Sequence, residues 1–414
     1  MITIRQLLLI GLICFSLTLI SFYLHTASFT NTMINYESEN HPNADELMVT
    51  DGFLPWAVDY HNTLPDFKKR PVTTILIESL SKLFNFRISI AFILINFGFQ
   101  FFCGFLIYFL ARIYALSHKE SFIGVIFFYC SFSILLAYFI PIATYDEPIQ
   151  YFFILLGLIA LRKKVMSLFV LFFTVAIITR ENTLILLPGI VLFLLGIDFR
   201  KLFHKKIKTL LLLIPMVLPV VFYVIYLFWF YGENPEMVES TKGAMTAKSS
   251  VYLKNFGSIK NTVTTVLFFI SVHLLPFFLV RIYKKKNSFT PFELNLVYAF
   301  ILTFCINTPL ILAFGYAEEC RVFILPFLFL FPVFGKIIKK SISFSLPFFK
   351  YMVHPIKLIV LLLVTILAWV IFDYFFSLTN LKMNENLYRE YNTFSVLIIG
   401  VILSYKSFIS KEKL

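Results

Sequence analysis

The 414-residue chain is 59% hydrophobic and only 14% charged, with 53 phenylalanines and a formal net charge of +13 at pH 7. A water-soluble protein of this length would leave too much apolar surface exposed, so the composition excludes that class and predicts a protein solvated by lipid. The positive charge falls in short clusters between apolar runs, as membrane topology requires, and we therefore expect no nucleic-acid partner.

The apolar runs predict an all-α polytopic membrane protein, a single domain from residue 1 to 414 with about 12 transmembrane helices. The expected spans lie near residues 6–26, 88–111, 121–143, 148–161, 165–179, 183–197, 209–231, 262–280, 292–314, 322–335, 358–378 and 393–408. The first run is interpreted as a retained signal-anchor helix. Basic clusters follow alternate spans, which predicts that both termini are cytoplasmic.

The longest polar segment, residues 27–87, is expected to form the first extracytoplasmic loop. Between residues 27 and 72 it carries seven acidic residues and three basic ones, a balance typical of that side of a membrane. Residues 71–86 place apolar side chains at helical spacing and predict an amphipathic helix on the membrane surface. A second outer loop is expected at residues 232–260.

Two neighbouring spans are too short to cross a bilayer completely. Residues 165–179 and 183–197 form runs of about 15 residues, whereas the hydrocarbon core needs about 20. They meet at Arg180, Glu181 and Asn182, so this charged turn should lie recessed within the membrane on the outer side.

The short runs 148–161 and 322–335 begin in the same way. Asp146 and Glu147 precede the first, and Glu319 and Arg321 precede the second. Because charge at this depth is costly unless it faces water or another charge, the three charged turns predict a polar cavity open to the outer face. The alternative is that these residues form ion pairs that tie helices together.

The residue types in this cavity favour transfer chemistry on a lipid phosphate. Arginine binds phosphate through two parallel hydrogen bonds and keeps its charge. A carboxylate of the acidic first loop can act as a general base toward a hydroxyl acceptor. Together they predict a donor whose phosphate reaches the arginines while its tail stays in the bilayer.

The order of these parts resembles the GT-C superfamily of integral-membrane glycosyltransferases, of the type that uses a polyprenyl-phosphate sugar. The likeness covers about the first half of the chain and the segment before the tenth span. It lies in Asp-Gly-Phe-Leu-Pro-Trp-Ala at 51–57, Arg-Pro at 70–71, Tyr-Asp-Glu-Pro at 145–148, Thr-Arg-Glu-Asn-Thr at 179–183 and Glu-x-Arg at 319–321.

The resemblance implies a reaction and roles for these residues. A hexosyl or pentosyl group would pass, with inversion, from the polyprenyl-phosphate donor to an extracytoplasmic glycan, lipid or protein of a bacterial inner (plasma) membrane. The base would be a first-loop acid, with Asp51, Asp45 and Glu46 as open candidates. The predicted substrate-binding residues are Arg70, Asp146, Glu147, Arg180, Glu181, Glu319 and Arg321, the arginines holding the phosphate. No cofactor is required, although paired acids can hold Mg²⁺ or Mn²⁺.

Two rival functions remain open on the sequence. One is a polymerase or ligase of envelope polysaccharide, which also acts on lipid-linked substrates with outer-loop arginines. The other is a transporter or flippase for a lipid-linked sugar. A transporter needs polar groups along a route through the whole membrane, whereas the charges predicted here gather in its outer half.

Overall fold

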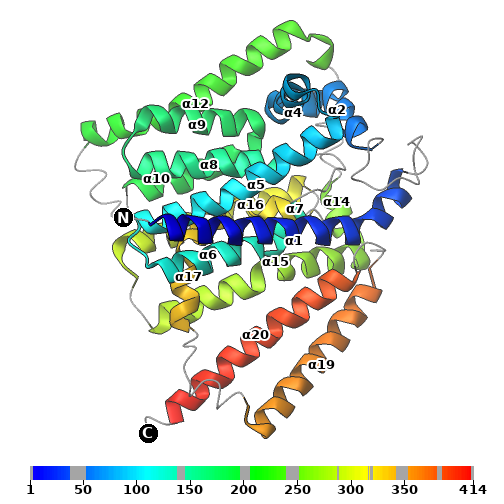
Figure 1. Ribbon diagram of the computed structural model, residues 1–414, viewed down its shortest axis with the longest axis vertical. Helices are drawn as coiled ribbons and strands as arrows, with labels where there is room; N and C mark the ends of the chain where they lie inside the picture. The colour runs from blue at the N-terminus through cyan, green and yellow to red at the C-terminus, as the bar shows by residue number, and fades with distance from the viewer. Residues whose placement is uncertain are drawn as a thin grey trace.

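The computed structural model of the chain contains helices and no strand in the part that it describes. That part comprises residues 3–37, 53–137, 145–195, 206–238, 251–286, 289–315, 317, 320–341, 353–379 and 385–411. The helices lie alongside one another in a bundle, with α19 and α20 forming a hairpin at one edge that packs against α15 (Ile259–Lys286) (Figure 1). The all-α class predicted from the sequence is confirmed for these residues.

Among the described residues, six helices are long and apolar enough to cross a membrane. They are the Ile4–Tyr23 part of α1 (Ile4–Glu37), α5 (Ile88–Ile113), the Ile214–Glu233 part of α12 (Lys206–Glu233), the Ile259–Tyr283 part of α15 (Ile259–Lys286), α16 (Pro291–Phe314) and α19 (Pro355–Ser377). All six coincide with predicted spans, so the chain is an integral membrane protein. The total of twelve stays a prediction.

Further helices accompany these spans. They include α6 (His118–Tyr129), α7 (Phe132–Ala137), α8 (Glu147–Arg162), α9 (Met166–Thr179), α10 (Leu187–Leu195), α14 (Val251–Phe256), α17 (Phe327–Ser341) and α20 (Glu385–Lys411). The 3₁₀ turn η1 (Glu181–Leu186) joins α9 to α10, and η2 (Cys320–Phe323) precedes α17. A charged turn therefore interrupts the helical path at each place where the sequence predicts a short span.

The first outer loop is partly helical. It contains α2 (Phe53–Thr63), α3 (Pro65–Lys68) and α4 (Pro71–Phe84), the last at the position of the predicted amphipathic helix. Proline in the first turn favours a helix start, and Asn85 ends α4 in a left-handed conformation with φ of 52°. Thr73, Thr74 and Ile77 are buried against the bundle, whereas Ile75, Leu83 and Phe84 are exposed. The exposed apolar side chains suit contact with lipid at the membrane surface.

Close helix contacts set the position of α8 and α17 in the bundle. α8 packs against α5 and α9, and α17 packs against α6. Glycine allows the second contact, because a Cβ on Gly124 would lie 2.9 Å from the backbone oxygen of Phe331 and one on Gly335 would overlap the carbonyl of Glu120. These seams bring the charged starts of α8 and α17 toward each other.

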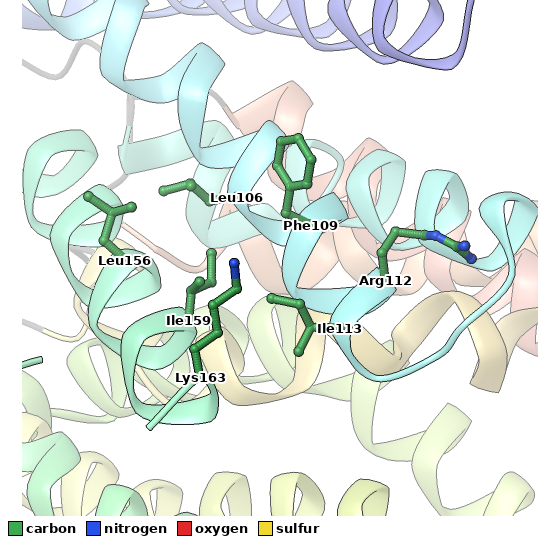
Figure 2. Close-up of a pocket in the computed structure, with 7 residues that line it drawn as sticks. All are labelled: Leu106, Phe109, Arg112, Ile113, Leu156, Ile159 and Lys163. Carbon is green, nitrogen blue, oxygen red and sulfur yellow. The ribbon is translucent and has the colours of Figure 1, made fainter. Parts of the chain in front are cut away.

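At the opposite end of α8, a groove of about 440 Å³ separates the ends of α5 and α8 (Figure 2). The residues that line it are Leu106, Phe109, Arg112, Ile113, Leu156, Ile159 and Lys163. The two ends of α8 thus differ: one begins in a charged network, and the other borders an apolar groove with a basic rim.

Candidate active site

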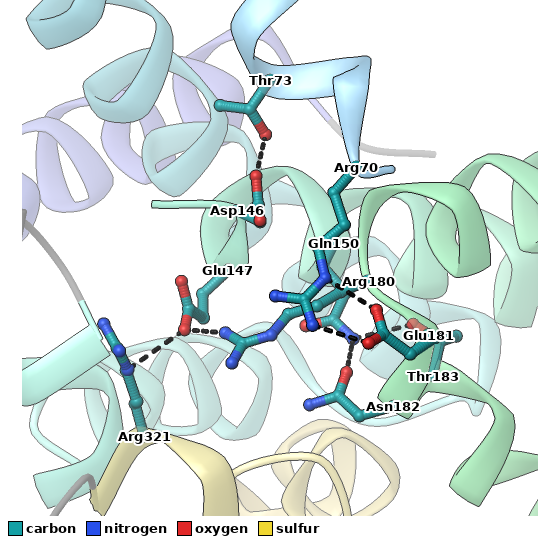
Figure 3. A network of polar contacts seen from close by, with 10 residues as sticks. All are labelled: Arg70, Thr73, Asp146, Glu147, Gln150, Arg180, Glu181, Asn182, Thr183 and Arg321. Atoms are coloured by element: carbon teal, nitrogen blue, oxygen red, sulfur yellow. Dashed lines mark hydrogen bonds and ion pairs between the residues drawn. The ribbon is translucent and has the colours of Figure 1, made fainter. Parts of the chain in front are cut away.

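Four elements meet at the charged end of the bundle: the starts of α4 and α8, the turn between α9 and η1, and η2. Figure 3 shows the polar side chains that they contribute and the contacts among them. The three charged turns predicted to face one region therefore do so, and the first outer loop joins them through α4.

Glu147 lies at the centre of this network. It is the first residue of α8 and only 1% exposed. Its Oε1 accepts a hydrogen bond from Arg180 and lies 3.2 Å from Nε of Arg321. Both arginines are themselves buried. One carboxylate thus stabilises two guanidinium groups from distant parts of the chain, in a region where an uncompensated charge would be costly.

Glu181 belongs to a second ion-pair group. Its two carboxylate oxygens accept hydrogen bonds of 2.7 and 2.6 Å from Nε and an Nη of Arg70, and Nζ of Lys69 lies 3.5 Å away. This two-bond geometry is the strong form of an arginine–carboxylate contact. Arg70 immediately precedes α4, so the ion pair fixes the start of the surface helix to the turn after α9.

The backbone explains why neighbouring Arg180 and Glu181 serve different groups. Arg180 is extended, with φ of −159° and ψ of 115°, between helical residues on either side. Successive side chains of an extended segment point in opposite directions. Arg180 therefore reaches Glu147 while Glu181 reaches Arg70, and each contact joins two elements.

Asp146 is fully buried beside Glu147. Its Oδ1 accepts a hydrogen bond of 2.7 Å from the Thr73 hydroxyl, and Oδ2 has no hydrogen-bond partner among the residues that the structure describes. Beside this contact, the hydroxyl of Thr74, which follows Thr73, lies 3.0 Å from that of Tyr145, which precedes Asp146. Two adjacent threonines of α4 thus position the surface helix on the start of α8.

Gln150 extends the network along α8. Its Nε2 donates to Oδ1 of Asn182 at 2.6 Å and contacts Oγ1 of Thr183 at 2.7 Å. Thr183 donates in turn to the backbone oxygen of Ala176 at 3.0 Å. These contacts fix the turn after α9 against α8, and so they orient the arginine at that turn.

The network includes residues that sequence reasoning missed. Thr73, Gln150 and Thr183 were not predicted site residues, although two of them carry a positional signal. Thr73 follows Arg70 by three residues and Gln150 follows Asp146 by four, spacings that place both members of each pair on one helix face. An uncharged polar residue in an apolar segment does not by itself predict a functional site, because its hydrogen-bond partners are not visible in the sequence.

The structure brings together six of the predicted site residues: Arg70, Asp146, Glu147, Arg180, Glu181 and Arg321. The predicted catalytic acids Asp51, Asp45 and Glu46 lie outside the described residues, and so does Glu319. The ion-pair interpretation of the charged turns is observed, since these residues form ion pairs between elements. The polar cavity open to the outer face stays a prediction, and so does the role of these residues in binding substrate.

Comparison with known proteins adds no family to this geometry. No family model matches the sequence, and no curated protein or solved structure gives a significant match. Within the described ranges, no group of three or more histidine, cysteine or acidic side chains could hold a metal ion. A role for Mg²⁺ or Mn²⁺ at paired acids stays a prediction.

Proposed function

We propose that the chain is an integral-membrane glycosyltransferase that transfers a sugar from a polyprenyl-phosphate donor to an extracytoplasmic acceptor. The observation that supports this function is the meeting of Arg70, Arg180 and Arg321 with buried carboxylates at one end of the bundle. Membrane proteins rarely carry ionisable groups in apolar regions, and when they do, the groups usually serve substrates, ions or protons.

In this proposal Arg180 and Arg321 bind the donor phosphate. Each guanidinium has five N–H donors, more than one carboxylate oxygen accepts, so a phosphate can be bound while the contact with Glu147 persists. Glu147 would then act as a positioning residue that holds both arginines at a fixed separation before the donor arrives. In the sequence-based expectation, Glu147 is instead one of the substrate-binding residues.

The chemical step is a substitution at the anomeric carbon. The acceptor oxygen forms the new glycosidic bond as the bond from that carbon to the phosphate oxygen breaks, and the bonding electrons leave with polyprenyl phosphate. The acceptor proton passes to a first-loop carboxylate, for which Asp51, Asp45 and Glu46 are the candidates. The arginines stabilise the negative charge that develops on the leaving phosphate.

The proposal includes an orientation in the membrane. We assign the charged network to the extracytoplasmic side and both termini to the cytoplasm, with twelve spans in a GT-C-like arrangement. The membrane would be the inner (plasma) membrane of a bacterium. The support is the positive-inside distribution of lysine and arginine in the sequence.

Sugar transfer from a radiolabelled polyprenyl-phosphate sugar to membrane acceptors tests this function directly. Arg321→Lys keeps the charge but loses the planar group, and we expect it to lower transfer about 100-fold, within the range for loss of one transition-state contact. Asp51→Asn and Asp45→Asn, assayed separately, identify the base. Arg389→Lys in the outlying hairpin is the matched control and should keep full activity.

The outcomes separate the rival functions. Full activity in Arg180→Ala, Arg321→Lys and both aspartate variants would overturn the site assignment. No transfer with any lipid-phosphate sugar, together with altered polysaccharide length in cells, would favour a polymerase or ligase. Protein-dependent movement of the lipid-linked sugar across vesicles, without transfer, would favour a flippase.

A further inference from the structure

The groove between the ends of α5 and α8 is built from two kinds of side chain. Leu106, Phe109, Leu156 and Ile159 are half-buried and form an apolar wall along both helices. Lys163 follows the last residue of α8 and is exposed at the rim. The groove volume of about 440 Å³ lies within the range of small-molecule sites, roughly 300–1,000 Å³.

The Lys163 side chain points into this groove. Figure 2 shows it running back along α8 beside Ile159, into the space between the two helices, while Arg112 extends away from it. Side chains of a helix lean toward its N-terminus, so a basic residue at the end of α8 is directed along the helix and not beyond it. The ammonium group is thus placed above apolar walls, where it favours a negative partner.

Neighbouring basic residues make contacts within the protein that Lys163 does not make. Arg112 donates to the carbonyl oxygen of Leu116. The Arg162 guanidinium lies 5.3 Å from the ring centre of Tyr114 and 4.2 Å from that of Phe292. Lys163 has no ion-pair or hydrogen-bond partner for its ammonium group within the described ranges. Of the two basic residues that line the groove, Lys163 is the one whose side chain is directed into it.

We propose that this groove is a binding site for an anionic glycerophospholipid of the leaflet beside the basic end of the bundle. The phosphate contacts the Lys163 ammonium, and one acyl chain lies against Leu106, Phe109, Leu156 and Ile159. Charge complementarity selects this occupant, because the groove combines an apolar wall with the Lys163 ammonium group directed into it. Basic pockets between membrane helices are known to bind anionic lipid headgroups. A zwitterionic lipid would make the same apolar contacts, but its headgroup would be attracted less strongly to the Lys163 ammonium group.

Lipid retention by the purified full-length protein in nonionic detergent tests the site. Native mass spectrometry compares bound phosphatidylglycerol with bound phosphatidylcholine of identical acyl chains. We expect the wild type to prefer phosphatidylglycerol about fivefold, the effect of one lysine near an anionic headgroup. Lys163→Gln should abolish this preference and Lys163→Arg should keep it. Lys164→Gln, which removes the adjacent charge outside the groove lining, should also keep it.

Filling the groove gives a second, independent readout. Leu156→Trp should lower retention of both lipids, whereas Leu363→Trp on the exposed face of α19 should not, and unchanged melting temperatures would show that each variant is folded. The proposal is overturned if Lys163→Gln keeps the preference or if Lys164→Gln loses it equally, since a diffuse basic surface would then be responsible. Equal retention of both lipids by the wild type would also overturn it.

Discussion

Helices α17 and α19 are both rich in apolar residues, yet they occupy opposite environments. In α17, Leu328, Leu330 and Phe334 are completely enclosed by protein. In α19, the most apolar of the six candidate spans, only 11% of the residues in its most apolar window are buried. The comparison teaches that hydropathy reports compatibility with lipid, whereas packing depends on small residues such as Gly335 that let backbones approach.

The same contrast applies to charge. In the bundle, Glu147 is enclosed and shared by Arg180 and Arg321. In the outlying hairpin, Asp373 pairs with Arg389, but the aspartate side chain is 55% exposed and Arg389 also lies 4.1 Å from the ring centre of Trp369. Removing a carboxylate should therefore be costly in the first region and cheap in the second.

The largest effect is expected from Glu147→Leu. This change leaves two buried guanidinium groups without their shared carboxylate and should lower the free energy of unfolding by about 3–5 kcal/mol. Reversible unfolding in mixed micelles measures it. Glu147→Gln should cost less, because its amide oxygen still accepts a hydrogen bond. A loss below about 1 kcal/mol for the leucine variant would contradict the central position of Glu147.

The next effect concerns the seam between α6 and α17. Gly335→Ala would place a methyl group on the Glu120 carbonyl, and the resulting overpacking should cost about 1–3 kcal/mol or more. Gly98→Ala is the matched control, since no atom lies within 4 Å of a Cβ at that position of α5. The same unfolding measurement compares the two variants. Equal free energies of unfolding would show that α6 and α17 can move apart without lowering the stability of the protein.

A smaller effect is expected at the contact between α4 and the turn after α9. A double-mutant cycle of Arg70→Lys and Glu181→Gln should give a coupling energy of about 1–2 kcal/mol, because lysine cannot form the two parallel hydrogen bonds. Susceptibility of the first loop to protease should rise in both single variants. Additive effects of the two changes would mean that this ion pair does not fix the surface helix.

The smallest effect is expected in the hairpin. Asp373→Asn should change the free energy of unfolding by less than about 1 kcal/mol, since the ion pair is half-exposed and Arg389 keeps its contact with Trp369. Unfolding under the conditions used for Glu147→Leu allows a direct comparison. Equal losses in the two variants would remove the distinction between bundle and hairpin.

Much of the local structure could be predicted because it depends on short-range patterns. Apolar run length predicted the six long helices, and the short run at 165–179 corresponds to α9, Met166–Thr179. The proline after Arg70 and the apolar spacing that follows predicted α4. Six predicted site residues also converge, since charge flanking a short span has few places to lie except beside other charge.

The sequence did not predict which of these residues would form ion pairs or hydrogen bonds with one another. Arg180 and Glu181 are adjacent and oppositely charged, which suggests a local pair, but an extended backbone at Arg180 turns them toward different elements. The contact of Arg321 with Glu147 joins residues far apart in the chain and depends on how η2 lies against the start of α8. The hydrogen bond from Thr73 to Asp146 likewise depends on the packing of α4 against the start of α8.

The sequence by itself determined that this is a membrane protein, where its six long apolar helices lie and which turns carry buried charge. It could do so because lipid imposes length and hydropathy on each segment separately. Tertiary structure alone decided which helices are enclosed, which carboxylate serves which arginine and where a groove remains between helix ends. Those properties depend on contacts between distant segments, where side-chain volume and direction, and not hydropathy, select the partner.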